Sequence, residues 1–402
     1  MDFTVLKLFK EQPFSVKLLS EKFFLIIIGF AFVFKVNIST PAILLLLLFN
    51  ISFKTQPIIS IKQKYLSIVF FSLYLLFFSS FLLTKEETSS NLIKTAGFIF
   101  IPLLFYLKRF NKNEIFVFIY SFVAFQIIHI IYVDYVMIDA IFFDKINDYD
   151  SITELVQRKF IIERPYFSLN CLLTMVCLKF AFDEKKISLF ITMLLFLFIT
   201  ISLFLIGARL AMGVSLLLFF LIVLRTKVIN KKHFLILISS FLILLIPVSK
   251  YTLERIFLKR GEPRIVIWDC AYKIINEKDF NYLIGEFSEV KSNQKQVDCY
   301  NSKEVISGPY WWIGTNKYNY NSHNQFLGFF MNYGLLGLLM FLSIFVIQVY
   351  DFVKRDNYIS LLIVAVFFFQ CIFENIISRN LGIYLFLWFN YFFIPQKRQY
   401  EQ

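Results

Sequence analysis

Apolar residues form long, nearly uninterrupted runs along the chain, and short polar stretches separate these runs. A membrane-spanning helix needs about 20 consecutive apolar residues. Twelve candidate spans cover residues 20–36, 40–53, 65–83, 92–107, 115–137, 166–182, 187–206, 208–224, 233–249, 325–349, 358–373 and 380–394. We therefore predict an all-α fold, a polytopic membrane helix bundle with about twelve transmembrane helices that forms one integral-membrane domain over residues 1–402.

Two polar intervals are longer than the others, at residues 139–165 and 250–321. The second lies between the ninth and tenth predicted spans and is large enough to hold helices of its own. Within it, residues 262–278 place Ile265, Trp268 and Tyr272 at helical spacing. This pattern predicts an amphipathic helix that lies on the membrane surface or covers a cavity.

Composition supports the membrane assignment. Of the 402 residues 58% are hydrophobic and 17% are charged, whereas a soluble domain has roughly 45–50% apolar and about 25% charged residues. No small-residue cleavage site follows the first apolar run, at residues 23–34, so we interpret this run as a retained helix and not as a signal peptide.

The net charge of +13 comes from 41 basic and 28 acidic residues. If the N-terminus is cytoplasmic, the basic groups of alternate loops all fall on the cytoplasmic side, which is the positive-inside pattern. This orientation makes both termini cytoplasmic and residues 250–321 a large periplasmic loop, and it removes the need for a nucleic-acid partner. The basic groups are Lys7, Lys10, Lys17 and Lys22; Lys54, Lys62 and Lys64; Lys108, Arg109 and Lys112; Lys185 and Lys186; Arg225, Lys227, Lys231 and Lys232; Lys354 and Arg355; Lys397 and Arg398.

The sequence contains no Walker A loop, GxGxxG, HExxH, CxxC pair or GxSxG. We therefore expect neither a metal nor a cofactor. Cys270 and Cys299 share the long loop, in a compartment that permits disulfides, so a bond between them is a candidate.

His323 is the main candidate for chemistry, because it stands where a helix emerges from the long loop, in the stretch SHNQFLGFFMNYGLLG. A neutral imidazole can take a proton from a sugar hydroxyl near pH 7, and Asn324 can orient the ring or the substrate. A helix-capping histidine is the alternative. The helix is expected to continue through Gly334 and Gly337, which are three residues apart and so share one face for close helix packing.

The other two histidines are weaker candidates. His129 lies within a predicted span, in QIIHIIY, and is expected to form a hydrogen bond with a neighbouring helix. His233 follows two lysines and is expected to flank a solvated cytoplasmic loop.

Several arginines are predicted at the same outer surface as His323. Arg209, in IGARLAMG, lies between two spans, and Arg264 lies four residues before Trp268. Both suit a phosphate, and the alternatives are interface snorkelling for Arg209 and a cation–π pair or a plain surface charge for Arg264. Arg164 stands at the mouth of the sixth span, and Glu374 and Arg379 flank the last outer hairpin, where each can be an interfacial anchor.

These residues resemble the superfamily of O-antigen ligases and O-antigen polymerases. Its hallmark is a His followed by Asn, Ser or Gln, nine residues, and Gly-x-x-Gly, which here reads His323-Asn324, residues 325–333 and Gly334-Leu-Leu-Gly337. The Gly-Ala-Arg at residues 207–209, the Arg264-x-x-x-Trp268 pattern and ERPYFSLN before the sixth span are similar to further family segments. Tyr282-Leu-Ile-Gly285 keeps fewer glycines than the family turn at that place.

The resemblance implies a metal-independent, inverting glycosyltransferase that moves a glycan from undecaprenyl diphosphate to an acceptor hydroxyl at the periplasmic face of the bacterial inner membrane. His323 would activate the acceptor, Arg209 and Arg264 would bind the donor diphosphate, and Arg164, Asn324 and Glu374 would support them. A ligase uses lipid A–core as its acceptor, whereas a polymerase uses a lipid-linked glycan; the intact His-to-Gly spacing favours a ligase slightly. A flippase or transporter fits less well, because the charged candidates gather at one face.

Overall fold

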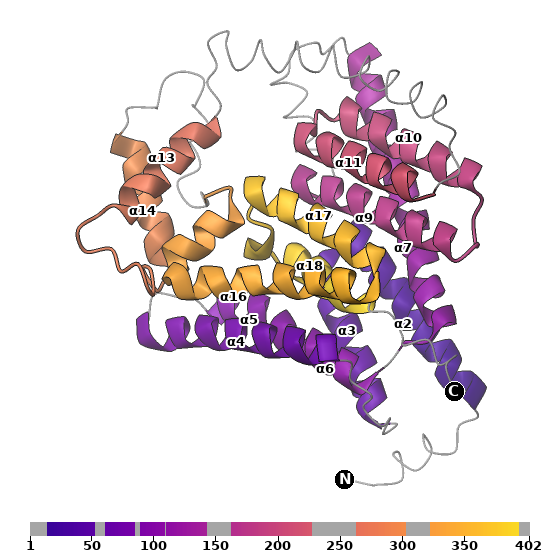
Figure 1. Cartoon of the computed structure of the whole chain (residues 1–402), viewed down its shortest axis with the longest axis horizontal. Helices are drawn as coiled ribbons and strands as arrows, with labels where there is room; N and C mark the ends of the chain where they lie inside the picture. The colour runs from indigo at the N-terminus through magenta and orange to yellow at the C-terminus, as the bar shows by residue number, and fades with distance from the viewer. Residues whose placement is uncertain are drawn as a thin grey trace.

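The computed structural model describes residues 14–52, 61–84, 89–108, 110–142, 162–226, 263–302 and 322–393, and over these ranges the chain is helical without any strand (Figure 1). The elements are α2 (Phe14–Phe34), α3 (Val36–Ser52), α4 (Ile61–Thr84), α5 (Ser89–Thr95), α6 (Gly97–Leu107), α7 (Lys112–Phe142), α9 (Arg164–Asp183), α10 (Leu189–Leu205), α11 (Arg209–Thr226), α13 (Pro263–Ile275), α14 (Glu289–Ser302), α16 (Gln325–Arg355), α17 (Tyr358–Phe373), the 3-10 helix η1 (Ile376–Ser378) and α18 (Asn380–Phe392).

The long apolar helices indicate a membrane protein. Four of the described helices are long and apolar enough to cross a bilayer, namely α4, residues 112–139 of α7, α9 and α16. Shorter apolar helices accompany them, at residues 37–51, 92–107, 189–205, 209–222 and 358–373. The predicted all-α class is confirmed for the described residues, and the predicted span at 233–249 lies outside them. The number of twelve spans stays a prediction.

The last helix, α18, is buried in the middle of the bundle. Every residue from Leu381 to Phe392 is buried, and the Trp388 ring packs against the rings of Phe32, Phe105 and Phe118 from three other helices. A helix that is apolar on all sides is either buried in protein or a membrane span, and these ring contacts show that α18 is surrounded by other helices. The segment predicted as a span at 380–394 is therefore an interior helix, not a lipid-facing one.

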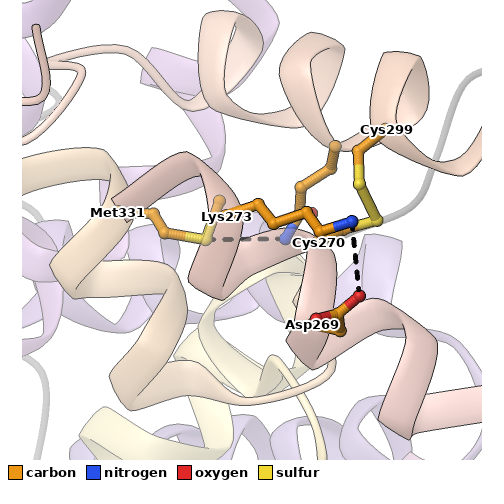
Figure 2. The surroundings of a disulfide bond; sticks show 6 residues. Asp269, Cys270, Lys273, Cys299 and Met331 are labelled. Carbon is orange, nitrogen blue, oxygen red and sulfur yellow. Dashed lines mark hydrogen bonds and ion pairs between the residues drawn. A yellow bond between two sulfur atoms is a disulfide. The ribbon is translucent and has the colours of Figure 1, made fainter. Parts of the chain in front are cut away.

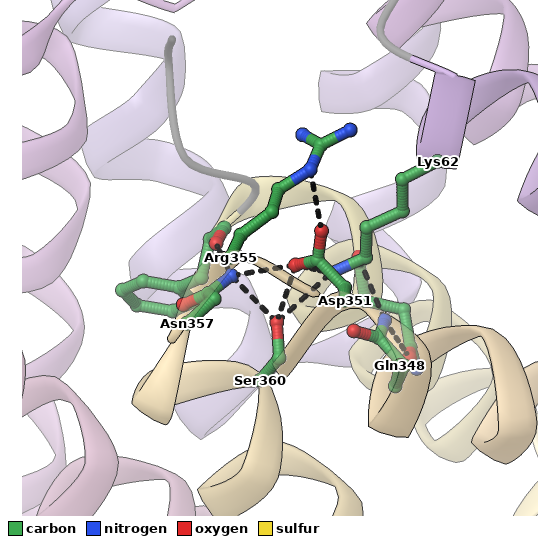
Figure 3. Close-up of polar contacts among 8 residues, drawn as sticks. Lys62, Gln348, Asp351, Arg355, Asn357 and Ser360 are labelled. Carbon is green, nitrogen blue, oxygen red and sulfur yellow. Dashed lines mark hydrogen bonds and ion pairs between the residues drawn. The ribbon is translucent and has the colours of Figure 1, made fainter. Parts of the chain in front are cut away.

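A buried polar network, which we call the Lys62 network, lies near the C-terminal end of α16 (Figure 3). Lys62 Nζ at the start of α4 lies 3.0 Å from Asp351 Oδ2 near the end of α16 and donates to Ser360 Oγ of α17 at 2.9 Å. Asn357 donates to the same carboxylate at 2.8 Å, and Arg355 Nε lies 3.4 Å from its other oxygen. Lys62 thus ties three helices together.

A second buried cluster involves Lys108, at the end of α6. Its ammonium lies 2.7 Å from Glu21 Oε2 of α2 and 2.9 Å from Glu114 Oε1 of α7. The charge pattern of the sequence counted both Lys62 and Lys108 among the basic residues of cytoplasmic loops. The structure shows that both are buried and paired, because acidic residues inside α2, α7 and α16 meet them.

At the other end, α13 and α14 lie beside the start of α16 (Figure 1). Here α16 is broken at Gly334, whose φ of 60° and ψ of −157° are not helical. The turn at residues 281–286 fills the break, because the amides of Leu335 and Leu336 donate to the carbonyls of Tyr282 and Leu283 at 2.9 and 3.1 Å. A Cβ on Gly334 would lie 2.4 Å from the carbonyl carbon of Leu283.

The expectation that Gly334 and Gly337 share one helical packing face is therefore wrong. Gly334 packs against a turn of the loop, not against a helix, and it adopts a conformation that suits glycine alone. At Gly337, an added Cβ would lie 2.4 Å from Cβ of Tyr333, so this glycine makes room for the break itself. Helical spacing predicted an unbroken helix. It could not show the break, because the turn at 281–286 that contacts Gly334 is remote in sequence.

Candidate functional site

His323 immediately precedes α16 and is held in an unusual backbone conformation. Its φ is 42°, in the left-handed region that non-glycine residues rarely adopt. Asn324 is the N-cap of α16, and its side-chain oxygen accepts a hydrogen bond from the amide of Leu327 at 3.0 Å. The sequence assigned Asn324 to orienting the ring or the substrate; the structure shows it capping the helix that presents His323.

The imidazole of His323 lies against Glu374. Nδ1 is 3.2 Å from Oε2, and the two side chains are 30% and 20% exposed. Glu374 directly follows α17, so the pair joins the start of α16 to the end of α17. The sequence placed Glu374 among weaker supporting residues, and the structure makes it the carboxylate partner of the histidine. We call His323 and Glu374 the dyad.

Polar side chains next to the dyad fix the segment around His323 relative to the segment around Glu374. Asn375 Nδ2 donates to Ser322 Oγ at 3.2 Å, and Ser322 Oγ also donates to the carbonyl of Asn324 at 2.8 Å. Gln325 accepts a hydrogen bond from the amide of Ile377 at 2.7 Å. The residues on both sides of His323 are thereby tied to those that follow Glu374.

The long loop contributes to the site through Trp268 of α13. Its Nε1 donates to the carbonyl of Ser322 at 3.1 Å, directly before the histidine. Cys270 and Cys299 form a disulfide that joins α13 to α14, with their Cα atoms 5.7 Å apart (Figure 2). The disulfide packs with Ile267 and Tyr300 in a small apolar core against which Trp268 also packs, so it holds in place the helix that carries this tryptophan.

A charged cluster stands where the turn at 281–286 meets α16. Glu286 pairs with Lys291 and Lys295 at 2.7 Å each, and its amide donates to the carbonyl of Met331 at 2.9 Å. Burial alone would raise the pKa of Glu286, but the two lysines outweigh it and lower that pKa. Burial acts to lower the pKa of Lys295, and Glu277 and Glu286 together raise it.

Two of the predicted arginines, the phosphate ligand Arg209 and the supporting residue Arg164, each begin a helix. Arg164 is the first residue of α9 and Arg209 the first of α11, and both helices pack against α17. Arg379, next to η1, lies 3.4 Å from Glu163, the residue before Arg164. Arg264 lies in the first turn of α13, and its side chain is outside the described part of the structure.

His129 does not behave as its sequence predicts. It is fully buried between the rings of Phe34 and Phe167, at centroid distances of 5.4 and 4.9 Å. Neither ring nitrogen has a hydrogen-bond partner among the described residues, so the expected bond to a neighbouring helix is absent there. His233 lies outside the described residues.

Four residues of the site were not predicted in these roles: Ser322, Gln325, Asn375 and Trp268. Trp268 did have a signal, the Arg-x-x-x-Trp pattern, but its partner is the chain before His323. No group of three or more His, Cys, Asp or Glu side chains within the described ranges could hold a metal ion. No protein-family model matches the chain, and a search of curated proteins found no match.

Proposed function

We propose that the protein is a membrane glycosyltransferase of the O-antigen ligase type, which moves a glycan from undecaprenyl diphosphate to a sugar hydroxyl of lipid A–core. The dyad carries this proposal, since it sets an imidazole against a carboxylate at a partly exposed helix start that the loop covers. The intact spacing from His323 to Gly334 and Gly337 supports the same assignment.

The dyad geometry fits a general base. With Nδ1–H donating to Glu374, Nε2 carries the lone pair that would accept the proton of the acceptor hydroxyl. The hydroxyl oxygen then forms a bond to the anomeric carbon of the donor. The bond from that carbon to the phosphate oxygen breaks, and its electron pair leaves with the diphosphate. A single displacement of this kind inverts the anomeric configuration and requires no metal.

The leaving diphosphate requires positive charge. Arg209 and Arg264 are the proposed ligands, with Arg164 in support. A guanidinium group can bind two phosphate oxygens at once and stabilises the negative charge that develops on the leaving diphosphate. Arg164 and Arg209 begin helices that pack on α17, whose end carries Glu374. We therefore assign the donor to the α9–α11 side of the dyad.

The proposed setting is the bacterial inner membrane, with twelve spans and both termini cytoplasmic. Residues 250–321 and the dyad are then periplasmic, and the Lys62 network is cytoplasmic. Lys62 at the start of α4 and Ser80, which contacts the turn after Gly285, are 18 residues apart. At about 1.5 Å per residue this is about 27 Å, close to the roughly 30 Å of a hydrocarbon core.

A polymerase that joins lipid-linked repeat units is the alternative, because it needs the same base and the same diphosphate ligands. The glycolipids of a deletion strain distinguish the two enzymes. Loss of a ligase leaves full-length chains on the lipid carrier, whereas loss of a polymerase leaves single repeats on lipid A–core.

The test of the proposal is His323→Ala in a transfer assay with purified protein and lipid-linked donor. Loss of a general base lowers the rate by about 10²–10⁴-fold, and the protein should still insert and melt like the wild type. His233→Ala is the matched control, since it removes a histidine from the basic stretch that we predict to be cytoplasmic. Full transfer by His323→Ala would refute the general-base role.

A further inference from the structure

A pocket opens beside the dyad, between α4, α5 and the first turns of α16. Its cavity volume is about 60 Å³, and it lies within a wider recess of about 700 Å³ that includes open solvent. Aromatic and amide side chains share its wall, including Phe77, Phe81, Phe329, Gln325, Asn332 and Asn375. Apolar walls with a few placed polar groups are typical of sites for small organic ligands.

The pocket and the dyad have residues in common. Asn375 lines the pocket, directly follows Glu374 and is bonded to Ser322, which directly precedes His323. Gln325, also in the wall, begins α16 two residues after the histidine. A molecule in the pocket is therefore next to the stretches of chain that position the dyad.

The pocket is lined from α4 and α16, whereas the two arginine-bearing helices pack against α17. Helix α16 packs against α17 and, elsewhere on its surface, against α4. The pocket is on the α4 side, whereas α9 and α11 pack against α17. The two sides can hold two different substrates at once.

The charges of the pocket argue against a diphosphate as its ligand. Lys94 and Glu289 both line it, so one cation is matched by one anion. Amide groups donate and accept hydrogen bonds and therefore suit hydroxyl groups, which do the same. Aromatic rings such as Phe81 and Phe329 offer apolar faces to the carbon–hydrogen side of a sugar ring. This chemistry fits a neutral sugar.

Apolar side chains border the pocket on the outside of the molecule. Leu82 and Leu83 follow Phe81 in α4 and are 56% and 73% exposed, and Ile93 of α5 is 67% exposed. In a membrane protein such exposed apolar groups meet lipid. The ligand that suits both the pocket and its surroundings is an amphiphile with a sugar headgroup and an alkyl chain.

We propose that this pocket binds the sugar headgroup of a membrane glycolipid. The role of that glycolipid as the acceptor, with its hydroxyl directed to His323, rests on the proposed transferase function. Binding of the headgroup itself does not depend on transfer.

The experiment uses the full-length protein in phosphatidylglycerol nanodiscs, with dodecyl maltoside as the probe. Octaethylene glycol monododecyl ether, which has the same alkyl chain and no sugar, is the control ligand. Saturation-transfer NMR should detect the sugar protons of the maltoside with wild-type protein. Thr95→Trp, which fills the pocket from α5, should weaken binding at least about tenfold, equivalent to 1.4 kcal/mol. Thr95 lines the pocket.

Ile93→Trp is the matched control, because it adds the same ring to an exposed residue of the same helix that does not line the pocket. It should bind the maltoside like the wild type. Leu92→Trp, from a second residue of the wall, repeats the test should Thr95→Trp melt early. Equal binding by the pocket and control variants, or equal saturation with both detergents, would overturn the proposal.

A transfer assay on the same variants separates the two proposals. If the wild-type protein binds the maltoside at the pocket but transfers no glycan, the pocket proposal is supported and the transferase proposal is refuted. If Thr95→Trp transfers glycan with the wild-type KM for the acceptor, the transferase proposal is supported and the pocket is not the acceptor site. A raised acceptor KM with an unchanged donor KM supports both.

Discussion

Two pairs, each of a nitrogen base and a carboxylate, lie at opposite ends of α16, and their distances are nearly equal. Lys62 and Asp351 are 3.0 Å apart, and His323 and Glu374 are 3.2 Å apart. Their surroundings differ. The first pair is 4% and 2% exposed, and the second is 30% and 20% exposed. Distance alone therefore does not distinguish a structural pair from a reactive one.

Exposure does distinguish them. Ser360, Asn357 and Arg355 surround the Lys62–Asp351 pair, and a buried pair is tolerated when such additional contacts satisfy both ions. The dyad is partly open, so a substrate can reach the imidazole. The Lys62 network thus suits stability, and the dyad suits chemistry.

Lys62→Ala should produce the largest change in stability. It leaves Asp351 buried without its main cation, for a loss of about 3 kcal/mol, at the low end of the roughly 3–5 kcal/mol typical of such cases because Arg355 remains nearby. Thermal unfolding in nanodiscs measures it. Lys64→Ala, at an exposed lysine of the same turn, is the control and should melt like the wild type. Equal melting of both variants would contradict a structural role for the network.

Glu374→Gln should lower the transfer rate without lowering stability, the reverse of the result expected for Lys62→Ala. The amide keeps the shape of the carboxylate but loses the charge that stabilises an imidazolium, and a hydrogen bond to a charged group is worth about 1.5–3 kcal/mol. We expect the transfer rate to fall about 10- to 100-fold with unchanged melting. Glu163→Gln, at an exposed glutamate of the same end, is the control. A lower melting temperature with an unchanged rate would make the dyad a structural pair like the first.

The apolar runs predicted the helices well, because each run is long and the signal is local. They did not show which helices face lipid. The residues of α18 look like those of any span, and only the rings of Phe32, Phe105 and Phe118 around Trp388 make it an interior helix. Burial of a helix depends on its neighbours, and these are not adjacent in sequence.

The candidate site was predicted in part for the same reason. His323 and Glu374 were both among the predicted site residues, but their contact joins residues 51 positions apart. The break at Gly334 depends on the turn at 281–286, so the spacing of Gly334 and Gly337 indicated a continuous helix instead. A local sequence pattern predicts the secondary structure of its own segment. Contacts between remote segments become known only from the folded structure.

The cluster of Glu286 with Lys291 and Lys295 is intermediate between the two pairs, and we expect the smallest effect there. Glu286 is 4% exposed, but Lys291 is 48% exposed, and each ion pair of this kind contributes less than about 1 kcal/mol. Because the folded-state pKa of Glu286 is lowered, its contribution is present above the ordinary pKa of 4.5 and is lost as the pH falls through the lowered value. The raised pKa of Lys295 gives the opposite sign, so its contribution is present below 10.5 and is lost as the pH rises through the raised value.

Comparing the melting temperatures of wild type and Glu286→Gln against pH measures this contribution. The wild type should melt higher at pH 7, and the difference should vanish as the pH falls below 4.5. Glu277→Gln, at a more exposed partner of Lys295, should show a smaller difference. A difference that persists at low pH would show that Glu286 acts by packing against the turn and not by its charge. The cluster would then belong with neither pair, because its stability would not depend on ionisation.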